Sequence, residues 1–590
     1  MKTSNKNKDA ASSVITDKER IAECSQIIYD GFIRYNNYFH RITRRARTRF
    51  EQRDWKGHQQ DINDRLDLYE KSVRRVVLAL HNFLRDRVRD DKLWYQIREY
   101  FGERLDEVPD NDFIKTFFNS TTRRIFGTSG INEQIEFVSG GPSDDMHLIM
   151  GLNIRRYPHW ISLQKIFETI LDDFSFRVPY NDLKANAKKI ADLIEDHAQK
   201  HFPADFAYIR FEFIDSFFYQ AARAYLVGKL IMNNGEAPIV IAFKNEVNGI
   251  EVDATFLTEN EISIIFGYTR SYYFADPNSV IGAVHFLKSI LPRKPIDELY
   301  TVLGRLRQGK TERHRTFSRH LNKTWDKFVH AEGDTGLVMI VFTLPSYNLV
   351  FKVIRDKFGY PKTISREEVI DKYKLVSKHD RAGRLIDTQD FHNLEFPVAR
   401  FSRDLRADLL DNAADSVRRE GTNLLFERVY VERRVRPLNL YINEAAEEDA
   451  IFAIIDYGQC IKDLAQTNIF TGDLLLKNFG VTAHKRVIFY DYDEVTLVTD
   501  CNFRDIPEAD DYEDEMLADT WYYVSENDIF PEEFIRFLSM KDKLKSEFMK
   551  YHADLLTAEY WRQIQEQHNR GEISLVVPYT STTTISRYLE

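Results

Sequence analysis

The chain has 590 residues, and a single hydrophobic core rarely supports a chain of this length, so at least two domains are expected. Hydrophobic residues make up 43% and charged residues 29% of the chain, which excludes a disordered or fibrous protein. The formal net charge of −10 argues against a general nucleic-acid binder, and three widely spaced cysteines argue against a disulfide framework.

The N-terminal residues 1–20 are polar and charged, and we interpret them as an extension without the apolar core of a signal peptide. No stretch of the sequence approaches the roughly 18 uninterrupted apolar residues that span a bilayer. We therefore expect a cytoplasmic protein that has no membrane partner.

Helical periodicity dominates the sequence from about Lys18 to Tyr225. Two runs rich in β-branched residues follow at 237–258, joined through Asn248-Gly249, a dipeptide typical of hairpin turns. The segment "ISIIFGYTRSYYF" continues this strand-like character. We predict a mainly helical domain over 21–325 with a small β insert near 237–275.

The pattern changes near residue 331. The segment "GLVMIVFTLPSYNLVFKVIRDKF" predicts two strands joined by a turn around Pro345-Ser346. A helix is predicted to begin at Ser365, which forms a capping box with Glu368. Further strands are predicted in "LLFERVYVERRV" and "VIFYDYDEVTLVT". We place a domain boundary at about residue 325, followed by an N-lobe over about 326–436 and a C-lobe over about 437–590.

The second half of the chain contains the parts that phosphoryl transfer from ATP requires: a phosphate cradle, a cation for the phosphates, Mg²⁺ ligands and a carboxylate for the acceptor hydroxyl. Gly333 and Gly336 precede the first strand and can bring backbone amides near phosphate. Lys352 lies in the apolar strand "VFKVI", where an ammonium group needs an anionic partner. Taken singly, such glycines are more often an ordinary turn and such a lysine an edge residue.

The segment "TGDLLLKNFG" contains Asp473 and Asn478 five positions apart, the offset of the aspartate and asparagine in the kinase catalytic loop. Thirteen residues later, Asp491 in "YDYDE" follows an apolar strand, where a kinase places its metal-binding aspartate. Lys477 can neutralise charge on the moving phosphoryl group. A helix end or a solvated turn would explain either segment alone, but their order and spacing favour a kinase-like site.

Three departures from ordinary protein kinases indicate an atypical kinase. The sequence has no G-x-G-x-x-G and no H-R-D, and Asp-Tyr-Asp stands in place of D-F-G. The additional acids Asp493 and Glu494 suggest a modified metal or substrate environment.

At these residues the sequence closely resembles the bacterial isocitrate dehydrogenase kinase/phosphatase family. The resemblance is carried by "GLVMIVFTLPSYNLVFKVIRDKF", "SKHDRAGRLIDTQDF", "YVERRVRPLN", "NIFTGDLLLKNFGVT", "VIFYDYDE" and "NFRDIP", and extends from about Ile21 to the end of the chain. It implies an α+β protein with a mostly helical N-terminal regulatory domain and a C-terminal bilobal protein-kinase-like domain. It also implies one active site that phosphorylates isocitrate dehydrogenase on serine with ATP and removes the phosphate, controlling flux between the tricarboxylic acid cycle and the glyoxylate bypass.

The resemblance also assigns residues to roles. The implied ATP-binding loop consists of Ala331, Glu332, Gly333, Asp334, Thr335, Gly336 and Leu337. The implied ATP-binding lysine is Lys352, and Glu432 begins the segment that resembles the adenine-holding hinge. The implied catalytic residues are Asp473 and Lys477, and the implied metal ligands are Asn478 and Asp491. The phosphatase residue falls on Asp387, for which the residues alone favour a capping aspartate after a helix end at 381–384.

The expected cofactors are ATP or ADP and Mg²⁺, and the resemblance adds AMP as an allosteric effector whose ligands the sequence does not identify. Isocitrate dehydrogenase is the implied protein partner, no nucleic acid is expected, and the family admits a homodimer that no motif here indicates. An acidic stretch over 505–519 is either a solvated loop or part of a docking loop.

Two alternatives remain open. One is an atypical protein or small-molecule kinase without phosphatase activity. The other is a binding module that uses the basic cluster Arg41, Arg44, Arg45, Arg47 and Arg49. A helix face partly balanced by Glu51 and Asp54 explains that cluster better.

Overall fold

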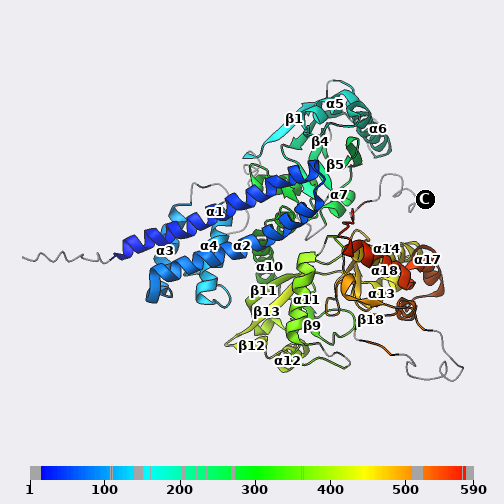
Figure 1. Cartoon of the computed structure of the whole chain (residues 1–590). Coiled ribbons are helices and arrows are strands. Elements are labelled where there is room, and N and C mark those ends of the chain that lie inside the picture. Colours follow the sequence, from blue (N-terminus) through cyan, green and yellow to red (C-terminus); the bar gives the residue numbers. More distant parts are fainter. Residues whose placement is uncertain are drawn as a thin grey trace, which may run out of the picture. The chain divides into compact units, whose positions relative to one another are not determined.

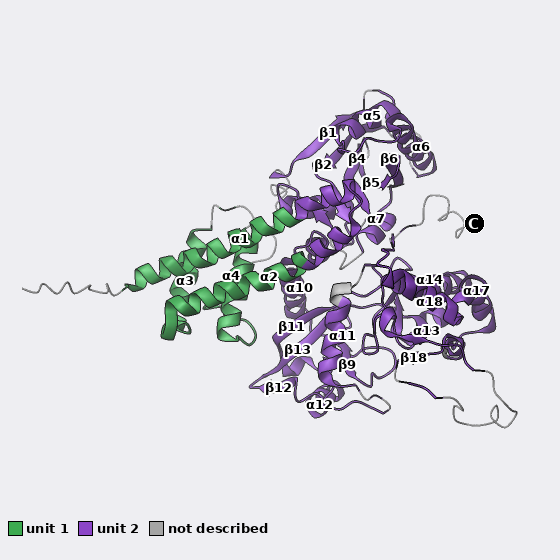
Figure 2. Cartoon of the chain, viewed as in Figure 1, with its two compact units in different colours: residues 1–42, 64–142 green, residues 43–63, 143–590 purple. Residues whose placement is uncertain are grey.

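The computed structural model describes residues 15–105, 108, 111–138, 151–159, 161–201, 207–220, 222–233, 235–267, 273–360, 362, 364–379, 381–507, 523–525, 527–574, 576–577 and 579. The chain forms two compact units, residues 1–42 with 64–142 and residues 43–63 with 143–590 (Figure 2). Helices α1 (Asp17–Glu51) and α2 (Trp55–Leu84) contribute residues to both units. Over the described ranges, none of the helices combines the length and the apolar character that crossing a membrane requires.

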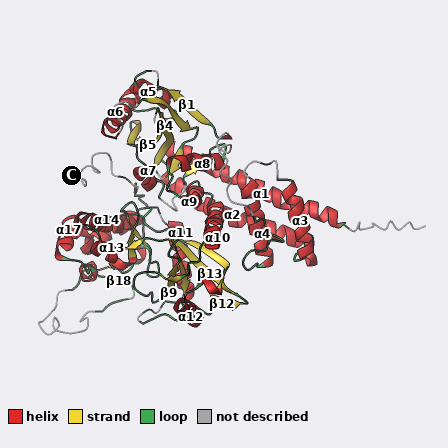
Figure 3. Cartoon of the chain, turned by 180° about the vertical axis from the view of Figure 1, so that it is seen from behind, coloured by secondary structure: helices red, strands yellow, loops and turns green. Residues whose placement is uncertain are grey.

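The described part of the first unit is helical (Figure 3), and it has an aromatic core. Besides its parts of α1 and α2 it contains η1 (Arg85–Arg87), α3 (Asp91–Glu103) and α4 (Asn111–Phe126). The rings of Tyr35 and Tyr69 meet edge to face at 5.2 Å, and those of Phe32 and Phe113 at 5.4 Å. Edge-to-face contacts of this kind stabilise a core beyond the area that they bury.

The second unit begins with a seven-stranded antiparallel sheet in the order β1-β2-β4-β3-β7, in which β5 pairs with β4 and β6 (Figure 1). Its strands are β1 (Ile154–Pro158), β2 (Tyr208–Ile214), β3 (Phe218–Gln220), β4 (Arg223–Met232), β5 (Gly235–Glu246), β6 (Gly249–Phe256) and β7 (Phe274–Ala275). The accompanying helices are α5 (Leu163–Asp173), α6 (Leu183–His201) and α7 (Glu259–Ile265). The predicted hairpin through Asn248-Gly249 is confirmed by the pairing of β5 with β6.

The expected extent of this sheet was wrong on two counts. Strands β1, β2 and β3 and the first residues of β4 lie in the region from Lys18 to Tyr225 that the periodicity assigned to helices. The second half of β2 and all of β3 are buried at every residue, so they lack the alternation that marks a half-exposed strand. Conversely, "ISII" belongs to helix α7, which begins with a capping box between Thr258 and Glu261. Residues 268–272 of the same segment lie outside the described residues.

Tyr579, near the end of the described chain, returns to this sheet. Its hydroxyl donates to Asp253 Oδ2 at 2.8 Å and accepts from Arg223 Nε at 3.2 Å. Its ring meets that of Phe256 edge to face at 4.9 Å. Tyr579 is buried and therefore belongs to the core of the sheet, more than 300 residues away in sequence.

The basic cluster on α1 is largely neutralised by carboxylates. Four of its arginines form ion pairs of 2.5 to 3.0 Å, namely Arg44–Asp276, Arg45–Asp61, Arg47–Glu51 and Arg49–Asp61. Arg49 also pairs with Asp54. A helix face balanced by acids therefore explains the cluster, as the sequence favoured.

Helices α8 (Val280–Ile290), α9 (Ile296–Val302) and α10 (Leu306–Lys323) lead to a six-stranded sheet in the order β11-β13-β10-β9-β8, with β12 paired to β13. The strands are β8 (Val329–His330), β9 (Met339–Thr343), β10 (Leu349–Ile354), β11 (Gln389–Pro397), β12 (Val417–Glu420) and β13 (Asn423–Arg433). Helix α11 (Arg366–His379) follows β10, and η3 (Val398–Arg400) and α12 (Arg403–Asn412) follow β11. The strand pair around Pro345-Ser346 and the capping box of Ser365 with Glu368 are confirmed.

A mainly helical lobe completes the chain after the short strand β14 (Arg436–Pro437). Its helices are α13 (Leu438–Glu444), α14 (Glu447–Gln466), η4 (Leu476–Asn478), η5 (Val498–Asp500), η6 (Pro531–Glu533), α16 (Phe534–Phe537), α17 (Asp542–His552), η7 (Ala553–Leu556) and α18 (Ala558–Asn569). Its strands are β15 (Phe479–Val481), β16 (Val487–Phe489), β17 (Asn502–Phe503) and β18 (Asp528–Ile529). Residues 508–519 of the acidic stretch, for which a solvated loop and a docking loop both remain open, lie outside the described residues.

Arg384 ties the segment after α11 to this helical lobe. Its guanidinium contacts both carboxylate oxygens of Asp456 at 2.8 Å and Asp463 Oδ2 at 2.7 Å, and donates to the carbonyl of Val487 at 2.9 Å. Because the Arg384 side chain is buried, these contacts replace its lost hydration. The arginine thereby joins α14 to the strand that precedes Asp491.

Candidate active site

A cleft of about 1780 Å³ lies between the six-stranded sheet and the helical lobe. Thirteen of the fourteen residues assigned from the sequence line it, namely residues 331–337, Lys352, Glu432, Asp473, Lys477, Asn478 and Asp491. The remaining assigned residue, Asp387, is not among the described residues that line the cleft. The structure therefore brings the kinase-like residues together and sets the phosphatase candidate apart.

The loop 331–337 joins β8 to β9 and forms one wall of the cleft. A Cβ on Gly336 would lie 2.6 Å from the carbonyl oxygen of Met339, so the backbone approaches itself too closely here for any other residue. Arg355 donates to the carbonyl of Gly336 at 3.2 Å and pairs with Asp408 at 2.9 Å. These contacts hold the loop where its backbone amides can meet phosphate.

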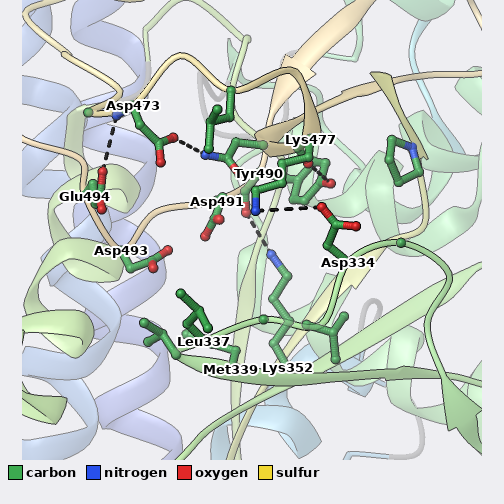
Figure 4. A pocket seen from close by; sticks show the side chains of 18 of the residues that line it. Asp334, Leu337, Met339, Lys352, Asp473, Lys477, Tyr490, Asp491, Asp493 and Glu494 are labelled. Atoms are coloured by element: carbon green, nitrogen blue, oxygen red, sulfur yellow. Dashed lines mark hydrogen bonds and ion pairs between the residues drawn. The ribbon is translucent and has the colours of Figure 1, made fainter. Parts of the chain in front are cut away.

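Lys352 on β10 has the anionic partner that its burial demands. Its Nζ lies 2.8 Å from Glu432 Oε2 and donates to the carbonyl oxygen of Tyr490 at 2.7 Å (Figure 4). Glu432 was assigned to the hinge that holds adenine. It lies one residue before the end of strand β13, shortly before β14 in the chain, but its buried carboxylate faces Lys352.

The loop between α14 and β15 carries Asp473, Lys477 and Asn478. The Asn478 amide donates to Asp473 Oδ1, and the Asp473 backbone N–H donates to Glu494 Oε2 at 3.3 Å (Figure 4). Gly472 makes this approach possible, since its φ is +80° and a Cβ there would lie 2.5 Å from Glu494 Cβ. Lys477 extends toward Asp334 of the nucleotide loop, with 3.7 Å between Nζ and Oδ2.

Carboxylates crowd the floor of the cleft. Burial, and after it the negative charge of Glu494, raises the pKa of Asp473 to about 6. Burial also raises the pKa of Asp491 well above its ordinary value, and the neighbouring Asp493 adds to this effect. Burial alone would raise the pKa of Asp493, but its hydrogen bond with Asp491 and the Lys362 ammonium hold that pKa below its ordinary value.

This crowding fits a divalent cation. Asp491 and Asn478 offer the hard oxygen ligands that Mg²⁺ prefers, and a bound cation would relieve the repulsion between Asp491 and Asp493. Across the residues that the structure describes, no three histidine, cysteine or acidic side chains form a ready-made metal cage. Mg²⁺ is usually held by one or two carboxylates together with substrate phosphates and water.

Lys362 is a cleft residue that sequence reasoning missed. Its Nζ lies 3.3 Å from Asp493 Oδ2 and also pairs with Glu494. It comes from the irregular segment between β10 and α11, where no periodicity or motif spacing singles out a lysine. The extra acids Asp493 and Glu494, which the sequence did single out, are its partners.

Asp387 belongs to a different environment. It is buried, and its Oδ2 lies 3.5 Å from Arg313 NH2 on α10, while Arg313 Nε contacts Asp297 at 2.8 Å. The described residues 381–387 form no helix, so the interpretation as a helix cap is wrong. Only the adjoining Ile386 reaches the cleft.

A lysine on a strand, a catalytic-loop aspartate with its asparagine, and an aspartate after β16, gathered between a sheet and a helical lobe, define a protein-kinase-like domain. Family models agree: residues 326–581 match the isocitrate dehydrogenase kinase/phosphatase (AceK) kinase domain, and residues 25–325 match the AceK regulatory domain. The chain belongs to the isocitrate dehydrogenase kinase/phosphatase family.

Relatives of nearly full length support this membership. A protein of Anaeromyxobacter sp. (strain Fw109-5) is 42% identical over 550 residues, which cover 93% of this chain and 95% of the relative. A protein of Xanthomonas campestris pv. campestris (strain 8004) is 41% identical over 576 residues, covering 96% of this chain and 98% of the relative. Both relatives bear the name isocitrate dehydrogenase kinase/phosphatase.

Proposed function

We propose that this chain phosphorylates isocitrate dehydrogenase on a serine with ATP and dephosphorylates it, controlling entry of carbon into the glyoxylate bypass. The convergence of Lys352, Asp473, Asn478 and Asp491 in one cleft of a chain from this family is the observation that carries the proposal. The name of the relatives identifies isocitrate dehydrogenase as the protein substrate in this proposal.

In the kinase direction, Lys352 and the amides of loop 331–337 hold the ATP phosphates. Asn478 and Asp491 would hold Mg²⁺, which would offset the negative charge of the phosphates. Asp473 takes the serine proton as the serine oxygen bonds to the γ-phosphorus and the bond to the leaving ADP oxygen breaks. Lys477, exposed at the mouth of the cleft, stabilises charge on the transferring group.

In the phosphatase direction, a water oxygen bonds to the phosphorus of phosphoserine, the bond from phosphorus to the serine oxygen breaks, and the serine oxygen gains a proton. The resemblance gives Asp387 a role in this step. Its position beside Arg313, outside the cleft lining, favours an indirect role for its carboxylate. The same position favours the second candidate function, an atypical protein kinase without phosphatase activity.

A label chase separates these two functions. The chain is incubated with isocitrate dehydrogenase and ATP labelled at the γ-phosphate, the ATP is removed, and ADP is added. The proposal expects label on a serine of isocitrate dehydrogenase, followed by release as inorganic phosphate. If isocitrate dehydrogenase becomes labelled and then keeps the label, the chain has the kinase activity, and the proposed phosphatase activity is refuted.

Three further parts of the proposal rest on the family resemblance: AMP as an allosteric effector, a homodimer, and a cytoplasmic location. A domain boundary near residue 325 is also proposed, in agreement with the limits of the two family models. AMP added to the chase should change the ratio of labelling to release, and sedimentation should give twice the mass of the chain.

A further inference from the structure

The anionic partner of Lys352 comes from an unexpected element. In protein kinases the strand lysine pairs with a glutamate on the helix that follows it in the chain. Here that helix is α11, yet the carboxylate 2.8 Å from Lys352 Nζ belongs to Glu432 on strand β13. Both side chains are less than 10% exposed, so the pair is shielded from water.

Helix α11 contributes Glu368, Lys372 and Tyr373 to the lining of the cleft, and its buried face is apolar. Val369, Tyr373 and Val376 are buried on that face. The Tyr373 ring stacks on Tyr430 with 4.2 Å between centroids, and Tyr430 stands directly opposite Lys352 in the β10–β13 pairing. An aromatic pair from α11 and β13 thus lies on the face of the sheet from which Lys352 extends.

Glu368 of α11 caps the N-terminus of the helix. Glu368 Oε2 accepts from the backbone N–H of Ser365 at 2.7 Å, and the Glu368 N–H donates to Ser365 Oγ at 3.2 Å. This capping box keeps the carboxylate at the first turn, on the exposed side of the helix.

The sheet holds Glu432 in place. Glu432 pairs with Val350, two residues from Lys352, so both charged side chains extend from the same face of the sheet as diagonal neighbours. Thr388 Oγ1 donates to Glu432 Oε1 at 2.6 Å. One carboxylate oxygen therefore faces Lys352 while the other is held by Thr388.

We propose that Glu432 is the residue that positions Lys352 for nucleotide binding and phosphoryl transfer, in place of a glutamate from α11, and that Thr388 orients its carboxylate. This inference rests on the proposed function, because it assigns Lys352 to the nucleotide. It differs from the hinge role expected for Glu432, since it gives the carboxylate itself a task.

The test compares nucleotide affinity and turnover in matched variants of the full chain. Glu432→Gln removes the negative charge and keeps the shape; the affinity for MgADP, measured by calorimetry, should fall about ten- to a hundredfold, the range for loss of a charge-assisted hydrogen bond. Thr388→Val should raise the KM for ATP by a smaller factor, and Thr388→Ser should restore it. Glu368→Gln, on α11, should leave both quantities within twofold.

Two results would overturn the inference: an affinity of Glu432→Gln within twofold of the parent chain, or an equal loss in Glu368→Gln. If Glu432→Gln does not fold, the comparison of Thr388→Val with Thr388→Ser decides the role of Glu432. A purely structural defect of Thr388→Val would not affect the KM for ATP alone, and Thr388→Ser would not restore that KM alone. Binding of MgADP without labelling of isocitrate dehydrogenase would refute the proposed function, and the ADP affinities would still decide the role of Glu432.

Discussion

Replacing Arg384 by methionine should destabilise the chain strongly. The substitution fills most of the space of the arginine stem but removes a guanidinium that contacts Asp456 and Asp463. Both carboxylates are less than 20% exposed, so water cannot replace the lost cation. Breaking a buried pair by removing one partner costs about 3–5 kcal/mol, which is the expected loss in the free energy of unfolding.

The pH dependence of this loss follows from Asp456. Burial alone would raise the pKa of Asp456, but Arg384 outweighs burial and holds it below its ordinary value. A depressed pKa in the folded state gives stability that is present above the unfolded pKa of about 3.9 and is lost as the pH falls through the folded pKa. In Arg384→Met burial is opposed only by Arg486 and the Val487 N–H, so the pKa of Asp456 rises. The difference in unfolding free energy between parent and variant should therefore narrow as the pH falls.

Urea unfolding followed by circular dichroism measures both effects. Arg418→Met is the matched control, because Arg418 pairs with Glu420 and Glu427 but is 48% exposed. Exposed pairs contribute about 0–1 kcal/mol, so the control should lose no more than that. Equal losses of unfolding free energy in the two variants would refute the reasoning. So would a difference between the parent chain and Arg384→Met that widens as the pH falls.

Asp473→Asn should slow labelling of isocitrate dehydrogenase by about 10²–10⁴-fold, the usual contribution of a general base, while ADP affinity measured by calorimetry stays within a few fold; near-normal labelling would remove Asp473 from the proton transfer. Gly336→Ala should raise the KM for ATP, since its Cβ would lie 2.6 Å from the Met339 carbonyl oxygen, and an unchanged KM would show that the loop does not hold phosphate. Asp387→Asn should slow phosphate release in the chase and spare labelling, whereas equal loss of both would count against a separate phosphatase role. Chelation by EDTA should stop labelling without unfolding the chain, as circular dichroism can check.

The sequence predicted the kinase-like residues because their order and spacing follow from the chemistry. Lys352 in an apolar strand implied an anion nearby, and the structure supplies one. The sequence could not identify Glu432 as that anion, because this requires the register of β10 against β13. The two strands are separated in the chain by α11, β11, η3, α12 and β12. Local signals such as the capping box of Ser365 with Glu368 were confirmed, since they involve residues a few positions apart.

Long-range burial explains what the sequence could not predict. The environment of Asp387 depends on Arg313, 74 residues earlier in the chain, and no local pattern connects the two. Strand β3 was taken for helix because burial at every residue removes the alternation that identifies a strand. The three cysteines, by contrast, are buried and free, as their wide spacing indicated.

The return of Tyr579 to the seven-stranded sheet has a consequence for synthesis of the protein. Asp253 on β6, which accepts a hydrogen bond from the Tyr579 hydroxyl, precedes Tyr579 by 326 residues. Strand β6 therefore leaves the ribosome long before Tyr579, which completes the packing of the sheet. Until then Asp253 and Arg223 must stay hydrated or pair with each other alone. The seven-stranded sheet can therefore reach its final packing only after the kinase-like lobe has been translated. Completion of this sheet is thus a late step in the folding of the newly synthesised chain.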